Sequence, residues 1–267
     1  MKEKLNIFFL CFFIAVFVAA AAIWLVFSYR YRQQLSNEEH TYKEIQNKLI
    51  RENTWKDTDK ISFYDNSNDN LENRRNKNIK TSLGLDIVKI PDVDFNSLKK
   101  YNNDIYAWIQ IPKLGISYPV LQHKRINNYY LTHNLDKSFG YPGCIFSEIN
   151  SKKDFSDALT VLYGHNMKDG SMFQGLHKYE SESYLQEHNK VYLYLPDGEA
   201  LTYTVIKCGY VKADSDTFWL GEQVETRTLL LSTCGSDSSK RLVLFCELPE
   251  KGEESETNGE DISIEVF

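Results

Sequence analysis

Metal-binding and disulfide patterns are missing from this sequence. Its five cysteines are an odd number, none belongs to a C-x-x-C pair, and its six histidines form no H-x-x-x-H or H-E-x-x-H pattern. This spacing argues against a dense disulfide framework and gives no zinc-ribbon pattern. We therefore expect neither a bound metal nor another cofactor.

An excess of positive charge is missing as well. The formal net charge is −6, and the segment 250–267 alone holds seven acidic residues against one lysine. The rest of the chain is therefore close to neutral, and a nucleic-acid partner is not expected, because the chain has no excess of basic residues to neutralise phosphates. We interpret 250–267 as a solvated acidic tail.

A long apolar run stands near the N-terminus. Ile7–Phe27 contains 21 apolar residues, enough to span a bilayer as one helix. Lysines precede the run and arginines follow it, so charge alone does not set its orientation. A cleaved signal peptide is the alternative, because Ala19–Ala22 offers a small-residue site. The apolar run continues beyond that site, which favours an uncleaved anchor.

Composition divides the chain into four predicted parts. Residues 1–28 are the cytoplasmic end and transmembrane anchor, 29–84 a stalk, 85–249 a compact domain and 250–267 the tail. Within the stalk we predict a polar helix from Ser36 to about Lys60, followed by an asparagine-rich stretch at 65–80. That stretch is either a spacer or a tolerated insertion.

The compact domain is predicted to be mainly β. Eight short runs of strand-forming residues are separated by turn residues, as in an all-β barrel or sandwich. The predicted strands are 107–111, 116–121, 143–147, 159–163, 191–195, 201–211, 228–233 and 241–248. Short helices are predicted at 95–101, 171–179 and 181–188.

The last two strands are predicted to form a hairpin that carries candidate catalytic residues. Antiparallel pairing places Cys234, at the end of one strand, beside Arg241, at the start of the next. Strand alternation puts Leu230, Ser232 and Cys234 on one face. A nucleophilic thiol requires an accessible, electropositive setting, which Arg241 can supply.

The remaining cysteines and histidines are weaker candidates. Cysteines 144, 208 and 246 fall inside predicted strands, where cysteine is usually an inert apolar residue. His165 follows the predicted strand 159–163 and is the candidate base, whereas the other histidines fall in polar loops or helical segments. Spacing alone leaves open a structural cysteine in a hairpin and a histidine in a turn.

Two motifs carry a family resemblance. Leu231-Ser-Thr-Cys234 with the downstream Arg241 resembles the T-L-x-T-C motif and arginine of the sortases. The segment YGHNMKDGSMF at 163–173 is similar to the histidine motif of class B sortases. Four shorter segments fit the same class, at 93–98, 108–112, 116–120 and 129–131.

The resemblance implies a fold, an activity and a location. It implies an eight-stranded sortase-type β-barrel with N-terminal helices and an N-terminal transmembrane helix, as in cysteine transpeptidases of Gram-positive cell surfaces. The resemblance, together with the helix, implies a single-pass protein of the cell membrane, with its catalytic domain on the extracellular face. The implied partners are secreted proteins with a C-terminal sorting signal similar to Asn-Pro-x-Thr, and an amine of the cell-wall peptidoglycan.

The resemblance also implies residue roles. Cys234 attacks the signal's threonine carbonyl to form a thioacyl enzyme, His165 transfers protons, and Arg241 holds the substrate and the oxyanion. Substrate-binding positions are implied at three further residues, Ser232, Asn127 and Leu131. The alternatives are a cysteine peptidase that hydrolyses the same signal, or an inactive membrane-tethered binding module.

The chain departs from the class B pattern in two places. Gly235 follows the candidate nucleophile where an acidic or polar side chain is common, and the segment 147–150 replaces a more usual aspartate-tyrosine pattern. Both differences are expected to affect substrate choice.

Overall fold

The computed structural model describes residues 2–55, 93–212, 227–235 and 239–249 of the 267-residue chain. The asparagine-rich stretch 65–80, the tail 250–267 and part of the turn 235–240 lie outside these residues. The helices are α1 (Lys2–Trp55), α2 (Phe95–Tyr101) and α3 (Glu182–Glu187), with 3-10 turns at Pro112–Leu114, Tyr129–Leu131 and Gln174–Glu180. The strands are β1 (Ile105–Ile111), β2 (Ile116–Leu121), β3 (Ile145–Ser147), β4 (Leu159–Tyr163), β5 (Lys190–Tyr194), β6 (Ala200–Lys212), β7 (Thr228–Cys234) and β8 (Lys240–Glu247).

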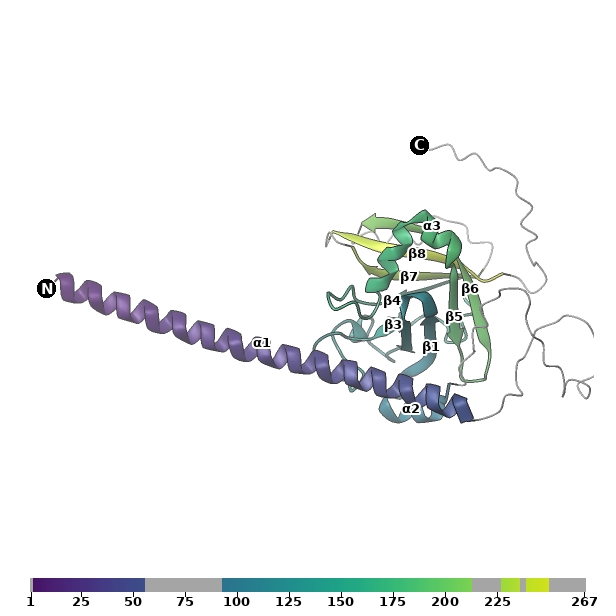
Figure 1. The fold of residues 1–267 in the computed structure, drawn as a ribbon, viewed down its shortest axis with the longest axis horizontal. Coiled ribbons are helices and arrows are strands. Elements are labelled where there is room, and N and C mark those ends of the chain that lie inside the picture. Colours follow the sequence, from purple (N-terminus) through teal and green to yellow (C-terminus); the bar gives the residue numbers. More distant parts are fainter. Residues whose placement is uncertain (1, 56–92, 213–226, 236–238, 250–267) are drawn as a thin grey trace, which may run out of the picture.

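The eight strands close into a barrel, which confirms the predicted fold (Figure 1). Their order around the barrel is β1-β2-β3-β4-β7-β8-β6-β5. Neighbouring strands are antiparallel except for the β2–β3 and β4–β7 pairs, which are parallel. The β4–β7 pair is important for the site, because parallel strands deliver their C-terminal ends to the same rim of a barrel.

The barrel interior holds the main core. Alternate strand residues point inward, so Leu229 and Leu231 of β7 belong to this core, with Trp108 and Leu162 from other strands. Leu230, between the two inward leucines, belongs instead to a separate small cluster that includes Val243 and Phe245 of β8. The even-numbered face of β7, which ends in Cys234, is therefore the face turned away from the main core.

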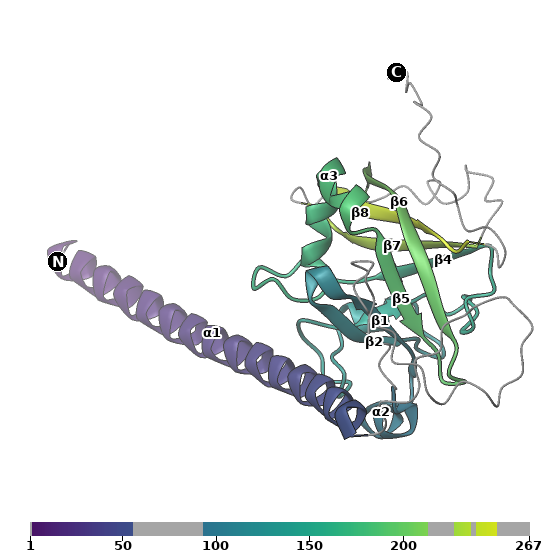
Figure 2. The same cartoon turned by 45° about the vertical axis from the view of Figure 1, so that its right-hand side comes forward.

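Helix α1 joins the apolar run to the polar helix that follows it. The apolar run and the polar helix form one uninterrupted helix, which runs from the barrel far out to one side (Figures 1 and 2). The part of α1 from Cys11 to Asn47 is long and apolar enough to cross a membrane. Farther along, Tyr42 and Ile45 are buried against the barrel domain. The predicted helix at 171–179 is instead a 3-10 segment at Gln174–Glu180.

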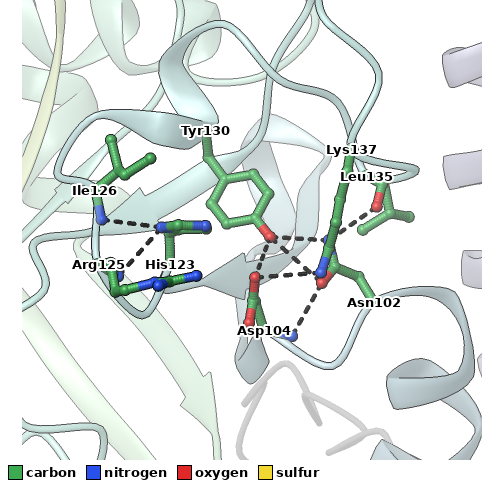
Figure 3. A network of polar contacts seen from close by, with 8 residues as sticks. All are labelled: Asn102, Asp104, His123, Arg125, Ile126, Tyr130, Leu135 and Lys137. Carbon is green, nitrogen blue, oxygen red and sulfur yellow. Dashed lines mark hydrogen bonds and ion pairs between the residues drawn. The ribbon is translucent and has the colours of Figure 1, made fainter.

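A buried polar network fixes the segment between β2 and β3 (Figure 3). The Tyr130 hydroxyl donates to Asp104 Oδ2 at 2.7 Å, and Asn102 Nδ2 donates to the Leu135 carbonyl at 2.9 Å. Lys137 Nζ lies 3.5 Å from the same Asp104 oxygen. Burial raises the pKa of Tyr130, and its hydrogen bond to Asp104 raises it further, so the hydroxyl stays a donor. The network holds residues 129–137 in place, and these residues reach the candidate site.

Candidate active site

Cys234 and Arg241 face each other at the end of the β7–β8 hairpin. They are register partners in the antiparallel pair, as the sequence predicted, and Arg241 Nη1 donates a hydrogen bond to Cys234 Sγ at 3.0 Å. Just beyond them, the Gly235 amide donates to the Lys240 carbonyl at 2.9 Å. The thiol is half-buried and lies against the positive charge of the guanidinium.

His165 reaches the same rim through the parallel β4–β7 pair. Tyr163 of β4 is the register partner of Ser232 of β7, and the Gly164 amide donates to the Ser232 carbonyl at 3.1 Å. His165 and Cys234 each follow this pair by two residues along parallel chains. The topology therefore places the imidazole and the thiol just beyond the neighbouring ends of β4 and β7. This proximity could not be predicted from the sequence, in which the two residues are far apart.

The imidazole of His165 is positioned by two contacts, with Leu131 and Tyr141. Its Nε2 lies 2.6 Å from the Leu131 carbonyl oxygen, and its ring centroid lies 5.2 Å from that of Tyr141. Because a carbonyl oxygen only accepts hydrogen bonds, Nε2 carries the proton and donates it. Within the described part of the chain, no hydrogen bond links this ring directly to the thiol.

Gly143 permits the close approach that positions the Leu131 carbonyl. Its φ is +67°, and a Cβ there would lie 2.6 Å from the Tyr130 carbonyl oxygen and 3.1 Å from that of Leu131. Any other residue would press these carbonyls apart and disturb the hydrogen bond to His165. The carbonyl of Gly143 also accepts from the Tyr42 hydroxyl of α1 at 3.3 Å, so the N-terminal helix supports this loop.

Asn166 and His177 are site neighbours to which the sequence analysis assigned no role. Asn166 Nδ2 donates to the Cys234 carbonyl at 3.0 Å and lies 3.0 Å from His177 Nε2. His177 Nε2 is itself 3.3 Å from that carbonyl, and its Nδ1 lies 2.7 Å from Glu180 Oε1. His177 was expected to be a solvated helix residue. Asn166 could have been noticed beside His165, but no sequence signal points to His177.

The predicted substrate-binding residues occupy different settings. Ser232 lies in line with Cys234 as predicted, but only 2% of it is exposed. Leu131 is exposed and contributes its carbonyl to His165. The exposed Asn127 side chain accepts a hydrogen bond from the Ile149 amide at 2.8 Å, which ties two loops together. Their roles in binding stay predictions.

The other cysteines differ from Cys234 in burial. Cys246 is buried in β8, and Cys144 is buried immediately before β3, where the sequence analysis had placed it inside a strand. Burial raises the pKa of both thiols well above its ordinary value. Burial raises the pKa of Cys208 in β6 to about 11.

Alkylation is therefore expected to select Cys234 over these three cysteines. At pH 8 a thiol with a pKa of about 11 is a thiolate in roughly one molecule in a thousand, and only the thiolate reacts. Peptide mass spectrometry of the folded full-length chain, sampled during iodoacetamide treatment, should show Cys234 modified before Cys144, Cys208 and Cys246. Equal or slower labelling of Cys234 would contradict its accessible, electropositive setting.

Neither the surface hollow beside His177 nor a cluster of metal-binding side chains marks the position of the three candidate residues within the described part of the chain. This hollow of about 690 Å³ lies beside His177 and Glu180 and is not lined by Cys234, His165 or Arg241. Among the described residues, no group of three or more His, Cys, Asp or Glu side chains is placed to hold a metal ion. A thiol beside a guanidinium, with an imidazole on the neighbouring chain end, provides the groups of an enzyme that uses a cysteine nucleophile.

Comparison with known proteins identifies the family. The sortase domain matches residues 109–249, which is more than half of the chain. The chain belongs to the sortase family, whose members are cysteine transpeptidases, and its relatives are class B sortases.

Two relatives and one structure illustrate the similarity. Sortase B of Listeria monocytogenes is 42% identical over 95 residues, which cover 36% of this chain and 38% of that protein. Sortase B of Staphylococcus aureus is 28% identical over 181 residues, covering 58% of this chain and 74% of that protein. A structure of the S. aureus sortase B–substrate complex matches with a TM-score of 0.52 and 25% identity, covering 58% of this chain and 84% of that one.

Proposed function

We propose that this chain is a membrane-anchored cysteine transpeptidase that cleaves a C-terminal sorting signal of secreted proteins and transfers them to a cell-wall amine. The observation that carries the proposal is the 3.0 Å hydrogen bond from Arg241 to Cys234 at the rim of a sortase barrel. The similarity to a sortase B solved as a substrate complex supports a substrate at the matching surface of this chain. The signal is expected to resemble Asn-Pro-x-Thr.

In the first half-reaction, the Cys234 thiol gives its proton to His165, and Sγ attacks the carbonyl carbon of the signal's threonine. Arg241, already in contact with the sulfur, donates hydrogen bonds to the oxyanion that develops on the carbonyl oxygen. The peptide C–N bond then breaks, the leaving amine takes a proton from His165, and the threonine remains bound to sulfur as a thioester.

In the second half-reaction, an amine of the cell wall attacks the thioester. His165 accepts the proton that the amine loses, a new amide bond forms, and the C–S bond breaks to restore Cys234. His165 Nε2 is occupied by its contact with the Leu131 carbonyl. These protons are therefore exchanged either at Nδ1 or at Nε2 after the ring has moved away from that carbonyl. Water in place of the amine would make the chain a peptidase.

The location follows from the apolar helix. The run Ile7–Phe27 anchors the chain in the cell membrane by a single pass, with the barrel on the extracellular face where the secreted substrates and the wall amine are found. The exposed apolar side chains of helix Cys11–Asn47 support this placement, since none of its most apolar window is buried within the protein.

A product analysis tests transfer against hydrolysis. The full-length chain in nanodiscs is given a labelled signal peptide and increasing amounts of an oligoglycine amine, and the products are separated by mass spectrometry. Transfer predicts an amine-linked product that grows at the expense of the hydrolysed one. Hydrolysed product alone, at every amine concentration, would favour the peptidase, and no product from intact protein would favour the binding module.

A further inference from the structure

The level of the bilayer along α1 can be deduced from its side chains. Ile7–Phe27 has 21 residues, which at 1.5 Å per residue gives about 31 Å, the thickness of a hydrocarbon core. The described side chains of this run are exposed, whereas Glu38, Tyr42 and Ile45 farther along the helix are buried. The change from lipid to protein surroundings therefore falls between Phe27 and Glu38.

The loop at 139–141 is attached to α1 within that interval. Gln34 Nε2 donates to the Phe139 carbonyl at 3.0 Å, and the rings of Tyr31 and Tyr141 meet edge to face at 6.2 Å. Tyr31 lies about 6 Å and Gln34 about 10 Å beyond Phe27 along the helix. Each polar interface of a bilayer is roughly 5–8 Å thick. The loop is thus held at or immediately above the lipid headgroups.

The exposed side chains at this level have the composition of a membrane interface. Phe139 is 75% exposed and Tyr141 45%, and Tyr29 and Tyr31 of the nearby segment of α1 are exposed as well. Aromatic rings concentrate where hydrocarbon meets water, because such a site accommodates both an apolar ring and a polar hydroxyl. Single exposed apolar residues are ordinary, but here Tyr31 and Tyr141 are in ring contact, and Phe139 and Tyr29 are each two residues away from one of them, so the exposed rings are grouped at one level of the helix.

The charges around the loop are mixed. A hollow of about 330 Å³ between α1 and residues 136–138 is lined by Arg30, Glu38, Asp136 and several uncharged polar side chains. Lys137 is already paired with Asp104. Because the hollow has no excess of basic groups, we expect the aromatic rings rather than net charge to determine the contact, and anionic lipid not to be required.

We propose that Phe139, Tyr141, Tyr29 and Tyr31 form an interfacial patch that rests on the outer surface of the bilayer. The inference rests on the anchoring in the proposed function and adds an orientation to it. Tyr141 packs on His165, so the patch places the catalytic rim close to the headgroups. The end of β7 and the start of β8 also lie on the side of the barrel toward which α1 runs to its N-terminus (Figure 1).

This orientation has a functional consequence. A soluble substrate approaches the rim from any direction, but a rim held at the membrane surface meets first those polypeptides that are themselves still inserted in the bilayer. The patch thus favours signals presented from a neighbouring membrane segment. The ligand of the patch is the lipid interface, and a peptide docked on the same rings is the alternative that the experiment must separate.

Fluorescence quenching by brominated lipid tests the orientation. Phe139→Trp is made in the full-length chain and compared with Ile206→Trp in proteoliposomes of zwitterionic lipid, with and without bromine near the headgroup end of the acyl chains. Ile206 of β6 is a matched control because it is also exposed, at 49%. It lies beside the C-terminal part of β8, whereas the catalytic rim is at the N-terminal end of β8. The parent chain, with its four native tryptophans, supplies the baseline to subtract.

The patch predicts that bromine quenches the fluorescence added by Phe139→Trp and leaves that added by Ile206→Trp unchanged. Equal signals at both positions, in protein that still resists alkaline extraction from the membrane, would overturn the patch and leave the anchor intact. Loss of the protein on alkaline extraction would instead contradict the anchor itself. Product formation from a soluble signal peptide tests the transpeptidase independently of both.

A second variant separates lipid from peptide. Phe139→Ser is expected to leave the turnover of a water-soluble signal peptide unchanged, and to slow several-fold the turnover of the same signal on a membrane-inserted polypeptide. The side chain of Phe139 projects to the surface against His133, so serine removes the ring without opening the core. Slower turnover of the soluble peptide would show that the ring binds substrate, and would overturn the lipid assignment.

Discussion

Cys234→Ala is expected to abolish both transfer and hydrolysis of a signal peptide, with a loss of at least about 10⁴-fold in kcat/KM. In the proposed mechanism the sulfur forms the only covalent bond to the substrate, so its removal eliminates both routes at once. Rates are measured by product formation with and without an amine, and a thioester adduct is sought by intact-protein mass spectrometry. The adduct should appear with the parent chain and be absent from the variant.

Cys208→Ala is the matched control for this experiment. Cys208 is a half-buried cysteine on β6, and its pKa is raised to about 11, so it is mostly protonated at neutral pH. Its substitution should leave turnover close to that of the parent chain. Substantial turnover by Cys234→Ala would refute the nucleophile assignment and favour a water-based hydrolysis or a binding module.

Arg241→Gln is expected to lower kcat/KM by about 10²- to 10³-fold. The guanidinium donates to the sulfur at 3.0 Å, and in the proposed mechanism it also donates to the oxyanion of the attacked carbonyl. Glutamine keeps similar length and a donor but removes the charge. Iodoacetamide labelling of Cys234 should also become slower, which reports on the thiol without any substrate.

Lys240→Gln serves as the comparison for the loss of charge. Lys240 is the neighbouring residue of β8, and its side chain is exposed. If its substitution reduces turnover as much as Arg241→Gln does, the effect is a general loss of positive charge rather than a contact with the reacting atoms. Thermal unfolding of both variants shows whether the barrel is intact.

Much of the barrel could be predicted from local pattern. Each predicted strand overlaps one strand of the structure, because alternating apolar residues and turn-forming residues mark strands without reference to their partners. The pairing of Cys234 with Arg241 was predictable for the same reason, since a short turn between two runs leaves few registers for a hairpin. The bounds of strands changed, as at Cys144, and the segment after Phe173 is a 3-10 helix rather than an α-helix.

Other features depend on contacts between distant segments. The sequence pattern divided α1 into an anchor and a separate helix, because composition changes near Phe27 while helix propensity does not. The contact of Asn166 with the Cys234 carbonyl joins residues 68 positions apart, and the Leu131 carbonyl reaches His165 across 34 positions. A local sequence pattern cannot predict contacts between residues so far apart in the chain.

The sequence by itself determined the membrane-length apolar run, the strand content and the hairpin that pairs Cys234 with Arg241, because periodicity and turn chemistry act over a few residues. Only the tertiary structure decided that β4 lies parallel to β7, which brings His165 to the rim. It alone also decided that Gly143 and Tyr141 support this histidine from a loop attached to α1. These arrangements arise from closing the barrel and packing α1 against it, where burial and hydrogen bonding select among many topologies that the same strands allow.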